Sequence, residues 1–305
     1  MNPEAEKMST LNLSRPPALL PPIGVAAWTA GTAAEPCEGD LWLLSLDGEA
    51  LGLFVLSRVH ATFVHGWPVT LPDDPAFSPA IIKDETPLGV GLTIWTGACT
   101  GLNNHLLHRR IGSLLSGVEV SALRSDMQMN LAGLHTPDKA YGDAESRQFL
   151  SRLLSHYQQL CYLNWPTATP GEGVLDRDAI ALAGLDLLTI RDKLEVSLAE
   201  ALALADGAVI PTVDQLEQIF SDDVELTSLL TEISGPEVAE LIHPLVKFDL
   251  LAIGSDRGVS ENAARNIAWR ELQLAARSTV PHHSATRQKV RDALDRLIAR
   301  EDDPA

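Results

Sequence analysis

The sequence predicts an α+β protein in which a small β-barrel precedes an all-helical C-terminal region. From Gly39 to Leu115, short apolar runs alternate with breaks of Gly, Pro and Asp, which is the pattern of a small antiparallel barrel. Beyond about Asp126 the apolar residues recur at helical spacing. A stretch rich in Pro and Gly, Asn164–Gly173, is the strongest candidate for a domain boundary. We expect an extended arm over residues 1–36, a barrel with trailing helices over 37–163 and a helical domain over 174–305.

The composition sets limits on the class of protein. The chain has 305 residues, 45% of them hydrophobic, which is enough for a packed core and suggests two domains. Its formal net charge of -18 argues against a surface coated for nucleic acid or anionic membrane, since phosphate binding needs a high density of cations. Cys37, Cys99 and Cys161 are odd in number and far apart, so we expect no disulfide framework, and without a C-x-x-C pair we expect no cysteine zinc site. No other metal and no cofactor are expected.

The N-terminal segment lacks the features of a targeting signal or a membrane anchor. Met1–Lys7 carries two glutamates and one lysine, where a secretory signal would be basic. No run reaches the ~18 uninterrupted apolar residues that a spanning helix needs. Pro16-Pro17 and Pro21-Pro22 interrupt any regular pattern before the barrel, so we expect this segment to be extended. These observations predict a cytoplasmic protein.

Several strands are expected in the first half of the chain. The turn Asp47-Gly48-Glu49 is of the Asp-Gly type that favours hairpins. The second run is almost entirely apolar, which predicts burial on both faces. The expected strands are Leu41–Leu46, Leu51–Ser57, Thr62–Thr70, a segment starting at Ile81-Ile82, and Gly89–Trp95.

The order of these pieces resembles the MazF/PemK-like toxin fold, a compact SH3-like barrel. The resemblance is carried by Gly39-Asp40-Leu41-Trp42, by Leu53–Ser57, by Trp67-Pro68-Val69-Thr70 and by the turn Ile111-Gly112-Ser113-Leu114. That family has a G-D/E-I-W opening strand, a V-L-V-I-S strand, a V-x-V-x-P-I-T strand and an L-G-x-L turn before a helix. The resemblance covers roughly a quarter of the chain.

The resemblance also implies a catalytic pair. In the family, an arginine before the second core strand and a threonine ending the third act on an RNA phosphate, where a cation stabilises the developing charge. Thr70 matches the threonine, but the arginine position falls on Leu51. Arg58 lies at the far end of the same strand, ~20 Å away at the usual rise per residue. We therefore expect a binding module, with an endoribonuclease that uses Thr70 as the alternative.

Aromatic, histidine and arginine side chains are the candidate binding residues of the barrel. His105 and His108 stand at i, i+3 in the segment His105–Arg110, which is expected to lead into a helix that runs to about Asn130. On one helical face, they could hold a metal or a phosphate; the alternative is a solvated helix start. The full set of candidates is Trp42, Arg58, Trp67, His105, His108, Arg109 and Arg110.

The helical half has three capping-box signatures, at Ser197, Thr212 and Ser234. Leu185–Phe220 is expected to form three short helices, and it resembles the helix-turn-helix of XRE-type regulators through Ser197-Leu198-Ala199-Glu200. The third helix carries Asp214 and Glu217 but no Lys or Arg, which disfavours DNA reading. The link before it is also longer than that turn usually allows. A plain helical bundle is the alternative.

A last amphipathic helix is expected over Ala285–Arg300, and its basic residues Arg287, Lys289 and Arg291 are the candidate basic face. Acidic neighbours interleave with them, so the face is expected to be solvated and paired at i, i+4. The other interpretation is a docking surface for an acidic partner or for nucleic acid.

From these patterns we expect a non-enzymatic regulatory or interaction protein related to toxin–antitoxin systems. Its barrel would bind a protein partner, and its helices a second partner or another copy of the chain. Binding of nucleic acid is expected to be weak, and no membrane is expected to take part. The alternatives are a MazF-like endoribonuclease and an XRE-like transcription regulator.

Overall fold

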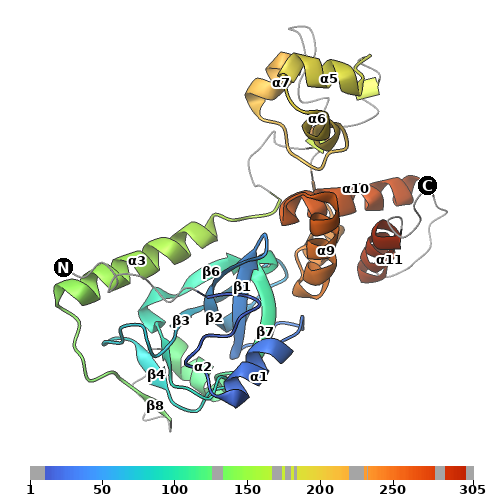
Figure 1. Cartoon of the computed structure of the whole chain (residues 1–305). Helices are drawn as coiled ribbons and strands as arrows, with labels where there is room; N and C mark the ends of the chain where they lie inside the picture. The colour runs from blue at the N-terminus through green and yellow to red at the C-terminus, as the bar shows by residue number, and fades with distance from the viewer. Residues whose placement is uncertain are drawn as a thin grey trace. The chain divides into compact units, whose positions relative to one another are not determined.

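The computed structural model describes residues 11–125, 133–166, 174–175, 180–181, 184–219, 230–231, 233–278 and 286–299 (Figure 1). The chain forms two compact units. The first comprises Met1–Leu163 and His243–Lys247, and the second comprises Asn164–Ile242 and Phe248–Ala305. The short return of the chain to the first unit at residues 243–247 has no signal in the sequence pattern.

The protein is α+β, as predicted, and its first unit is built on an antiparallel sheet of eight strands. The order is β7-β1-β2-β3-β5-β4-β8, with β6 paired to the first half of β3. Among the described residues the edge strands β7 and β8 do not pair, so the sheet is not closed. The strands are β1 Asp40–Leu46, β2 Glu49–Val59, β3 Phe63–Thr70, β4 Ile81–Lys83, β5 Leu92–Ile94, β6 Thr100–Asn103, β7 Leu107–Ser113 and β8 Leu134–His135.

The turn between β1 and β2 has the predicted conformation. Asp47 and Gly48 have φ angles of 49° and 77°, the two positive values that a tight hairpin turn of this type requires. The turn sets the antiparallel register in which Leu43 lies opposite Leu53. This pairing brings the first two predicted strands together as expected.

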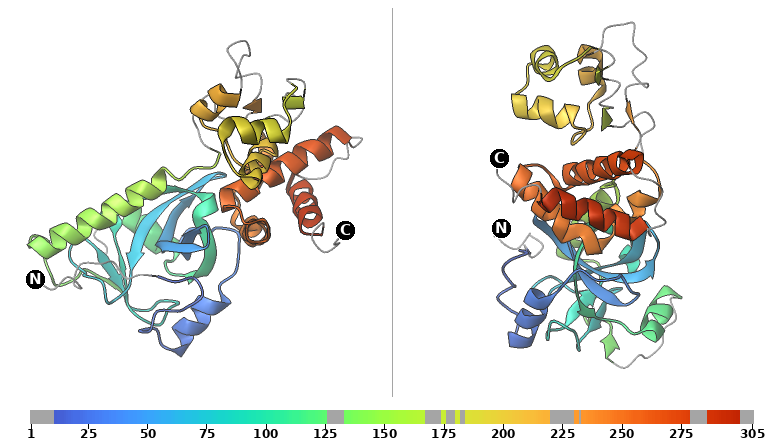
Figure 2. Two further views of the ribbon diagram at one scale, coloured as in Figure 1. Left: turned by 45° about the horizontal axis from the view of Figure 1, so that its top comes forward. Right: turned by 90° about the vertical axis from the view of Figure 1, so that its right-hand side faces the viewer.

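The sheet is buried on both faces, as the apolar run of the second strand predicted. Alternate residues of one strand enter different clusters, because successive side chains of a strand point to opposite faces. Leu41 and Leu43 join a cluster with Trp67 and Val69, whereas Trp42 and Leu44 join Phe54 and Leu56. Helix α3 (Ala144–Cys161) covers the second cluster with Phe149, Leu153, Tyr157 and Leu160. Figure 2 shows α3 along one side of the sheet and α1 on the other.

The predicted extended arm contains a helix. Helix α1 spans Pro22–Ala30 and buries Trp28 completely in the first cluster. Pro21-Pro22 suggested an interruption, but a proline is well tolerated at the first helical position, where its missing N–H has no partner to lose. The expectation of an extended chain is therefore wrong for this segment.

The helix expected between His105 and about Asn130 is confirmed only in part. That stretch instead contains a short 3₁₀ turn (Asn104–Leu106), strand β7 and helix α2 (Gly117–Arg124). Ser116 and Glu119 form a capping box at the start of α2, satisfying free backbone N–H groups there. Residues 126–130, the end of the predicted helix, lie outside the described residues. A second 3₁₀ turn spans Thr96–Ala98.

Where the structure describes it, the second unit is helical apart from a short antiparallel pair, β9 (Val174–Leu175) with β10 (Leu230–Thr231). The three predicted short helices are confirmed, and Ile190, Leu204 and Ile219 are among the residues of their shared core. The helices are α5 Leu187–Leu194, α6 Leu198–Ala205, α7 Val213–Ile219, α8 Pro236–Leu241, α9 Lys247–Arg257, α10 Glu261–Ser278 and α11 Thr286–Ala299. Between α8 and α9, the segment that belongs to the first unit contains a 3₁₀ turn at Pro244–Val246.

Two of the three predicted capping boxes form. Ser197 caps α6, and Thr212 exchanges hydrogen bonds with Gln215 at the start of α7. The prediction at Ser234 is wrong, because α8 is preceded by Gly235 and starts with a proline. No helix within the described residues is both long enough and apolar enough to cross a membrane.

Candidate functional site

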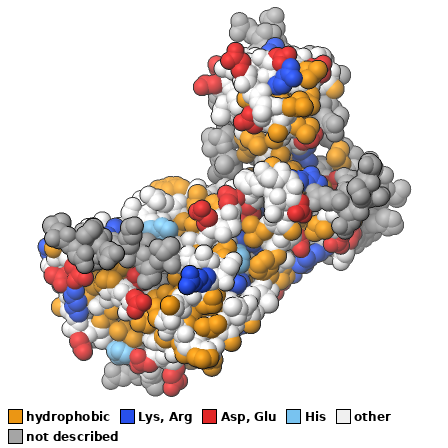
Figure 3. Space-filling model, in the orientation of Figure 1, with side chains coloured by type: hydrophobic (Ala, Val, Ile, Leu, Met, Phe, Trp, Pro, Cys, Tyr) orange, Lys and Arg blue, Asp and Glu red, His pale blue; other side chains and the backbone are white. Residues whose placement is uncertain are grey.

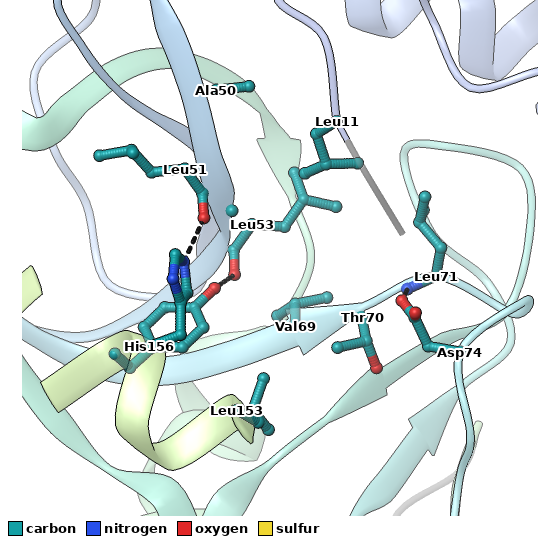
Figure 4. A pocket seen from close by; sticks show the side chains of 12 residues that line it. Leu11, Ala50, Leu51, Leu53, Val69, Thr70, Leu71, Asp74, Leu153 and His156 are labelled. Carbon is teal, nitrogen blue, oxygen red and sulfur yellow. Dashed lines mark hydrogen bonds between the residues drawn. The ribbon is translucent and has the colours of Figure 1, made fainter. Parts of the chain in front are cut away.

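A cavity of about 200 Å³ opens between the start of β2, the end of β3 and helix α3 (Figure 4). Its walls are mainly apolar, and four polar side chains interrupt them. The apolar lining comprises Leu11, Ala50, Leu51, Leu53, Val69, Leu71 and Leu153. The polar lining comprises Thr70, Asp74, His156 and Tyr157, with Gly52 completing the wall.

Thr70 ends β3 and holds a neighbouring tryptophan in place. Its hydroxyl oxygen accepts a hydrogen bond of 3.0 Å from the indole Nε1 of Trp95. Thr70 is 7% exposed and Trp95 is 2% exposed, so this is a bond between buried groups. Replacing the hydroxyl by a methyl group would leave a buried indole N–H without its acceptor, a costly state.

Helix α3 supplies the hydrogen bonds that the start of β2 lacks. The pairing of β2 with β3 reaches only to Leu53 opposite Val69, and Leu51 lies beyond it. The Nε2 atom of His156 lies 2.6 Å from the Leu51 carbonyl oxygen, and the Tyr157 hydroxyl donates to the Leu53 carbonyl at 2.7 Å. Since a carbonyl only accepts, the proton of His156 in this bond is on Nε2. Both side chains therefore complete the hydrogen bonding of strand β2.

The ionisation of Tyr157 follows from the same burial. Removal from water raises the pKa of its hydroxyl, and the negative charge of Asp74 raises that pKa further. The phenol is therefore neutral and acts as a hydrogen-bond donor. Asp74 in turn accepts the backbone N–H of Leu71 on its Oδ2 atom at 3.3 Å, which fixes the turn after β3.

No lysine or arginine is among the described residues that line this cavity. Leu51, at the position where the toxin resemblance requires an arginine, is one of its apolar walls. A phosphoryl or phosphorane charge in the cavity would face Asp74 and apolar carbons without a compensating cation. The arrangement favours an apolar occupant over a phosphate.

Trp42 and Trp67 are core residues, so their predicted binding roles are wrong. Trp42 has no exposed surface and Trp67 has 2%. They lie in the clusters on opposite faces of the sheet. Both tryptophans therefore stabilise the sheet from within.

His105 and His108 do not share a helical face. His105 lies in the 3₁₀ turn and is 1% exposed, with its Nδ1 atom 2.8 Å from Oδ1 of Asn103. His108 is in β7 and is 5% exposed. The backbone carbonyl of His105 accepts a hydrogen bond from the buried ammonium group of Lys247 at 2.6 Å. No cluster of three metal-ligating side chains occurs in the described ranges of the chain.

The two arginines of β7 are occupied by contacts within the first unit. Arg110 forms an ion pair with the buried Asp40, with Nε 2.8 Å from Oδ2, and this hydrogen bond raises the pKa of Arg110. Arg109 donates to the backbone carbonyl of Leu13 and lies 5.9 Å from the ring centre of Trp28. Burial lowers the pKa of Arg109. These arginines hold the N-terminal segment and the first strand.

The C-terminal arginines pair with carboxylates of other helices. Arg287 on α11 contacts Glu240 of α8, and Arg291 contacts Asp249 of α9, each at 2.9 Å. On α11 these pairs join different helices, whereas on α10 Arg265 pairs with Glu261 at i, i+4, as the sequence pattern predicted. Lys289 is exposed and has no carboxylate within ion-pair distance in the described part of the chain. On the face drawn in Figure 3, basic side chains lie scattered among acidic ones.

The toxin resemblance singled out Thr70 and Leu51 as site positions, but no sequence pattern predicted that residues of α3 line the same cavity. Asp74, His156 and Tyr157 come from segments far apart in the chain, and only folding brings them to β2. The helical spacing that placed Leu153 and Tyr157 on one buried face was the available signal. Comparison with family models, with curated proteins and with solved structures gives no match for this chain.

Proposed function

We propose that the chain is a non-enzymatic regulatory or interaction protein of a toxin–antitoxin-related kind. Its β unit, a degenerate MazF/PemK-like SH3-type fold, serves as a binding module. The cavity beside Thr70 takes one apolar side chain from an extended segment of a protein partner.

The chemistry of the cavity walls carries this proposal. Each of the four polar side chains in the wall has a hydrogen-bond partner inside the chain, at distances between 2.6 and 3.3 Å. The rest of the lining is aliphatic carbon and one glycine. Pockets for drug-sized molecules have volumes of roughly 300–1,000 Å³, so a cavity of about 200 Å³ suits a single side chain. Apolar burial would supply the binding energy.

The positions singled out by the toxin resemblance support the same site. Leu51 and Thr70, which occupy the positions of the family's catalytic arginine and threonine, line one cavity. The family site is thus proposed to persist as a recess whose catalytic cation has been replaced by a leucine. An active endoribonuclease would need a cation from elsewhere, and Arg58 lies at the opposite end of β2.

The proposed regulatory role does not use the helix-turn-helix interpretation of the second unit. The link between α6 and α7 runs from Asp206 to Thr212, longer than the usual turn of three or four residues. Helix α7 has Asp214 and Glu217 and no basic residue. A helix of this charge would be repelled by phosphates. Recognition of DNA by α7 is therefore not part of the proposal.

The test is a methyl NMR titration of the full chain with six-residue peptides that differ only in one central residue. Peptides with a central Leu or Phe should shift the methyl signals of Leu53 and Val69, and peptides with Ser or Lys should not. Leu51→Trp should fill the cavity and abolish the shifts. The matched control is Val59→Trp, an exposed site at the other end of β2, which should leave them unchanged. Equal binding of the Lys peptide would contradict the proposal.

A further inference from the structure

The tip of the β2–β3 hairpin presents three aromatic rings at the surface. His60 and Phe63 stack with ring centres 4.3 Å apart and planes 17° apart. His65 meets both rings edge-on, at 5.4 Å from His60 and 5.2 Å from Phe63. His60 is exposed, and Phe63 keeps 38% of its surface in solvent. We call His60, Phe63 and His65, with Arg58 beside them, the hairpin platform.

The backbone that supports the hairpin platform is fixed by a single buried residue. Asn104, which is 2% exposed, donates its side-chain amide to the carbonyl oxygens of His60 and Ala61, at 3.2 and 3.0 Å. Its backbone N–H donates to Thr62 at 3.1 Å. Three successive loop carbonyls are therefore held in place. A surface fixed before binding loses less entropy when a ligand docks.

A neighbouring strand leaves room for the ring of His65. Gly101 of β6 lies opposite His65 in the sheet. A Cβ atom at Gly101 would lie only 3.1 Å from the Cδ2 atom of His65, tighter than most real contacts. The missing side chain thus allows the imidazole to lie close against β6.

The charge around the hairpin platform differs from that of the whole chain. Arg58 is exposed, lies opposite His65 across the strand pair, and has no carboxylate partner among the described residues. The two segments that build the tip, residues 57–66 and 96–106, contain no Asp or Glu, although the chain has 41 acidic residues against 23 basic ones. Glu38 precedes Gly39, whose N–H donates to the Leu56 carbonyl of β2, but its carboxylate pairs with Arg124. An anion at this point therefore meets a guanidinium group that forms no ion pair with a described carboxylate.

We propose that the hairpin platform binds a mononucleotide, with the base against the aromatic rings and the phosphate at Arg58. Exposed histidine and phenylalanine rings stack on bases of any sequence, and a guanidinium group binds phosphate oxygens through paired N–H donors. The platform offers one cation, which matches one phosphate group. The net charge of -18 opposes a long polyanion far more than a single nucleotide. This site lies at the opposite end of β2 from the cavity beside Thr70 and does not depend on it.

The test is an NMR titration of the full chain with AMP, adenosine, ribose 5-phosphate and a ten-residue oligo(dA) at fixed ionic strength. AMP should shift the signals of His60, Phe63 and His65 and should bind more tightly than adenosine or ribose 5-phosphate. Arg58→Gln should weaken AMP about tenfold, to the affinity of adenosine, because it removes only the phosphate contact. Phe63→Leu should weaken both AMP and adenosine, because it removes the stacking surface.

The matched control is Arg287→Gln, which removes an exposed arginine from the other unit and should leave AMP binding unchanged. Identical AMP affinity in the wild type and in Arg58→Gln would overturn the proposal, as would the absence of any shift at the hairpin with millimolar AMP. Oligo(dA) binding that is much tighter than AMP and falls steeply with salt would overturn the choice of a mononucleotide in favour of a single strand.

Discussion

The two ends of strand β2 differ in what their polar groups already bind. At its start, the carbonyls of Leu51 and Leu53 are satisfied by His156 and Tyr157, and the adjoining Thr70 hydroxyl holds Trp95. At its end, Arg58 has no carboxylate partner within the described residues. The first end is therefore suited to an apolar occupant, and the second is suited to an anion with an aromatic part.

This difference shows that the type of a residue predicts its function less well than the hydrogen bonds and ion pairs that the residue forms in the folded chain. Thr70 and the C-terminal arginines have the right chemistry for RNA or phosphate, but the fold engages the threonine, Arg287 and Arg291 internally. Arg58, a candidate binding residue in the sequence, lies at the opposite end of β2. Among the described residues no carboxylate pairs with it.

The largest expected effect concerns the close contact that shapes the first end of β2. A Cβ atom at Gly52 would lie 2.5 Å from the Tyr157 hydroxyl oxygen, so Gly52→Ala must displace that buried ring. Loss of its hydrogen bond and repacking should cost about 2–4 kcal/mol of unfolding free energy in the first unit. Chemical denaturation followed by Trp fluorescence measures this. Gly117→Ala, at a helical site with open space, is the control and should not destabilise.

The next prediction tests whether Thr70 is a structural acceptor. Thr70→Val keeps the shape but removes the oxygen that the buried Trp95 indole binds, and should cost about 1–3 kcal/mol. Thr70→Ser keeps an oxygen and should cost less. The indole N–H signal of Trp95 should move only in the valine variant. Equal stability of the valine and wild-type proteins would show that the bond to Trp95 contributes little.

A smaller effect is expected at the C-terminal arginines. Arg291→Gln breaks a partly exposed ion pair, which should lower stability by only about 0–1 kcal/mol. Burial raises the pKa of Asp249, the charge of Arg291 opposes that rise, and Asp295 adds to it. The pKa of Asp249 should therefore rise further in this variant. A carboxyl NMR titration measures it, and an unchanged pKa would mean that the pair is not formed in solution.

The smallest expected effect is a change in the pKa of His65, at the second end of β2. Burial lowers the pKa of His65 below 6.5, and the charges of His60 and Arg58 lower it further. Arg58→Gln should raise this pKa, because it removes one of the opposing charges. Since the unfolded chain binds this proton more readily, the lowered pKa makes stability fall as pH drops below 6.5. That loss should be smaller in Arg58→Gln, and an NMR titration of His65 follows the change.

Local patterns predicted the elements that depend on local chemistry. The Asp47-Gly48 turn, the apolar run of β2 and the caps at Ser197 and Thr212 all form, because each is decided by neighbours within a few residues. Thr70 and Leu51, which the toxin resemblance singled out in the sequence, line the same cavity.

The errors arose where distant parts of the chain override local preference. His105-Leu106-Leu107-His108 fits a helix by spacing, but pairing with β1 and burial in the sheet make β7 a strand. Trp42 and Trp67 have the chemistry of binding residues, but the sheet is covered on both faces and buries them. The α3 wall of the cavity depends on a contact between His156 and Leu51, more than a hundred positions apart, which no local pattern reveals.

The most direct test of the central claim is incubation of the full chain with a long unstructured single-stranded RNA in the absence of metal. The cavity beside Thr70 has no lysine or arginine among its described lining residues, so the RNA should remain intact with the wild type, with Thr70→Ala and with Arg58→Gln. Discrete fragments produced by the wild type and by Arg58→Gln, but not by Thr70→Ala, would contradict the account. They would show that the first end of β2 is a catalytic site.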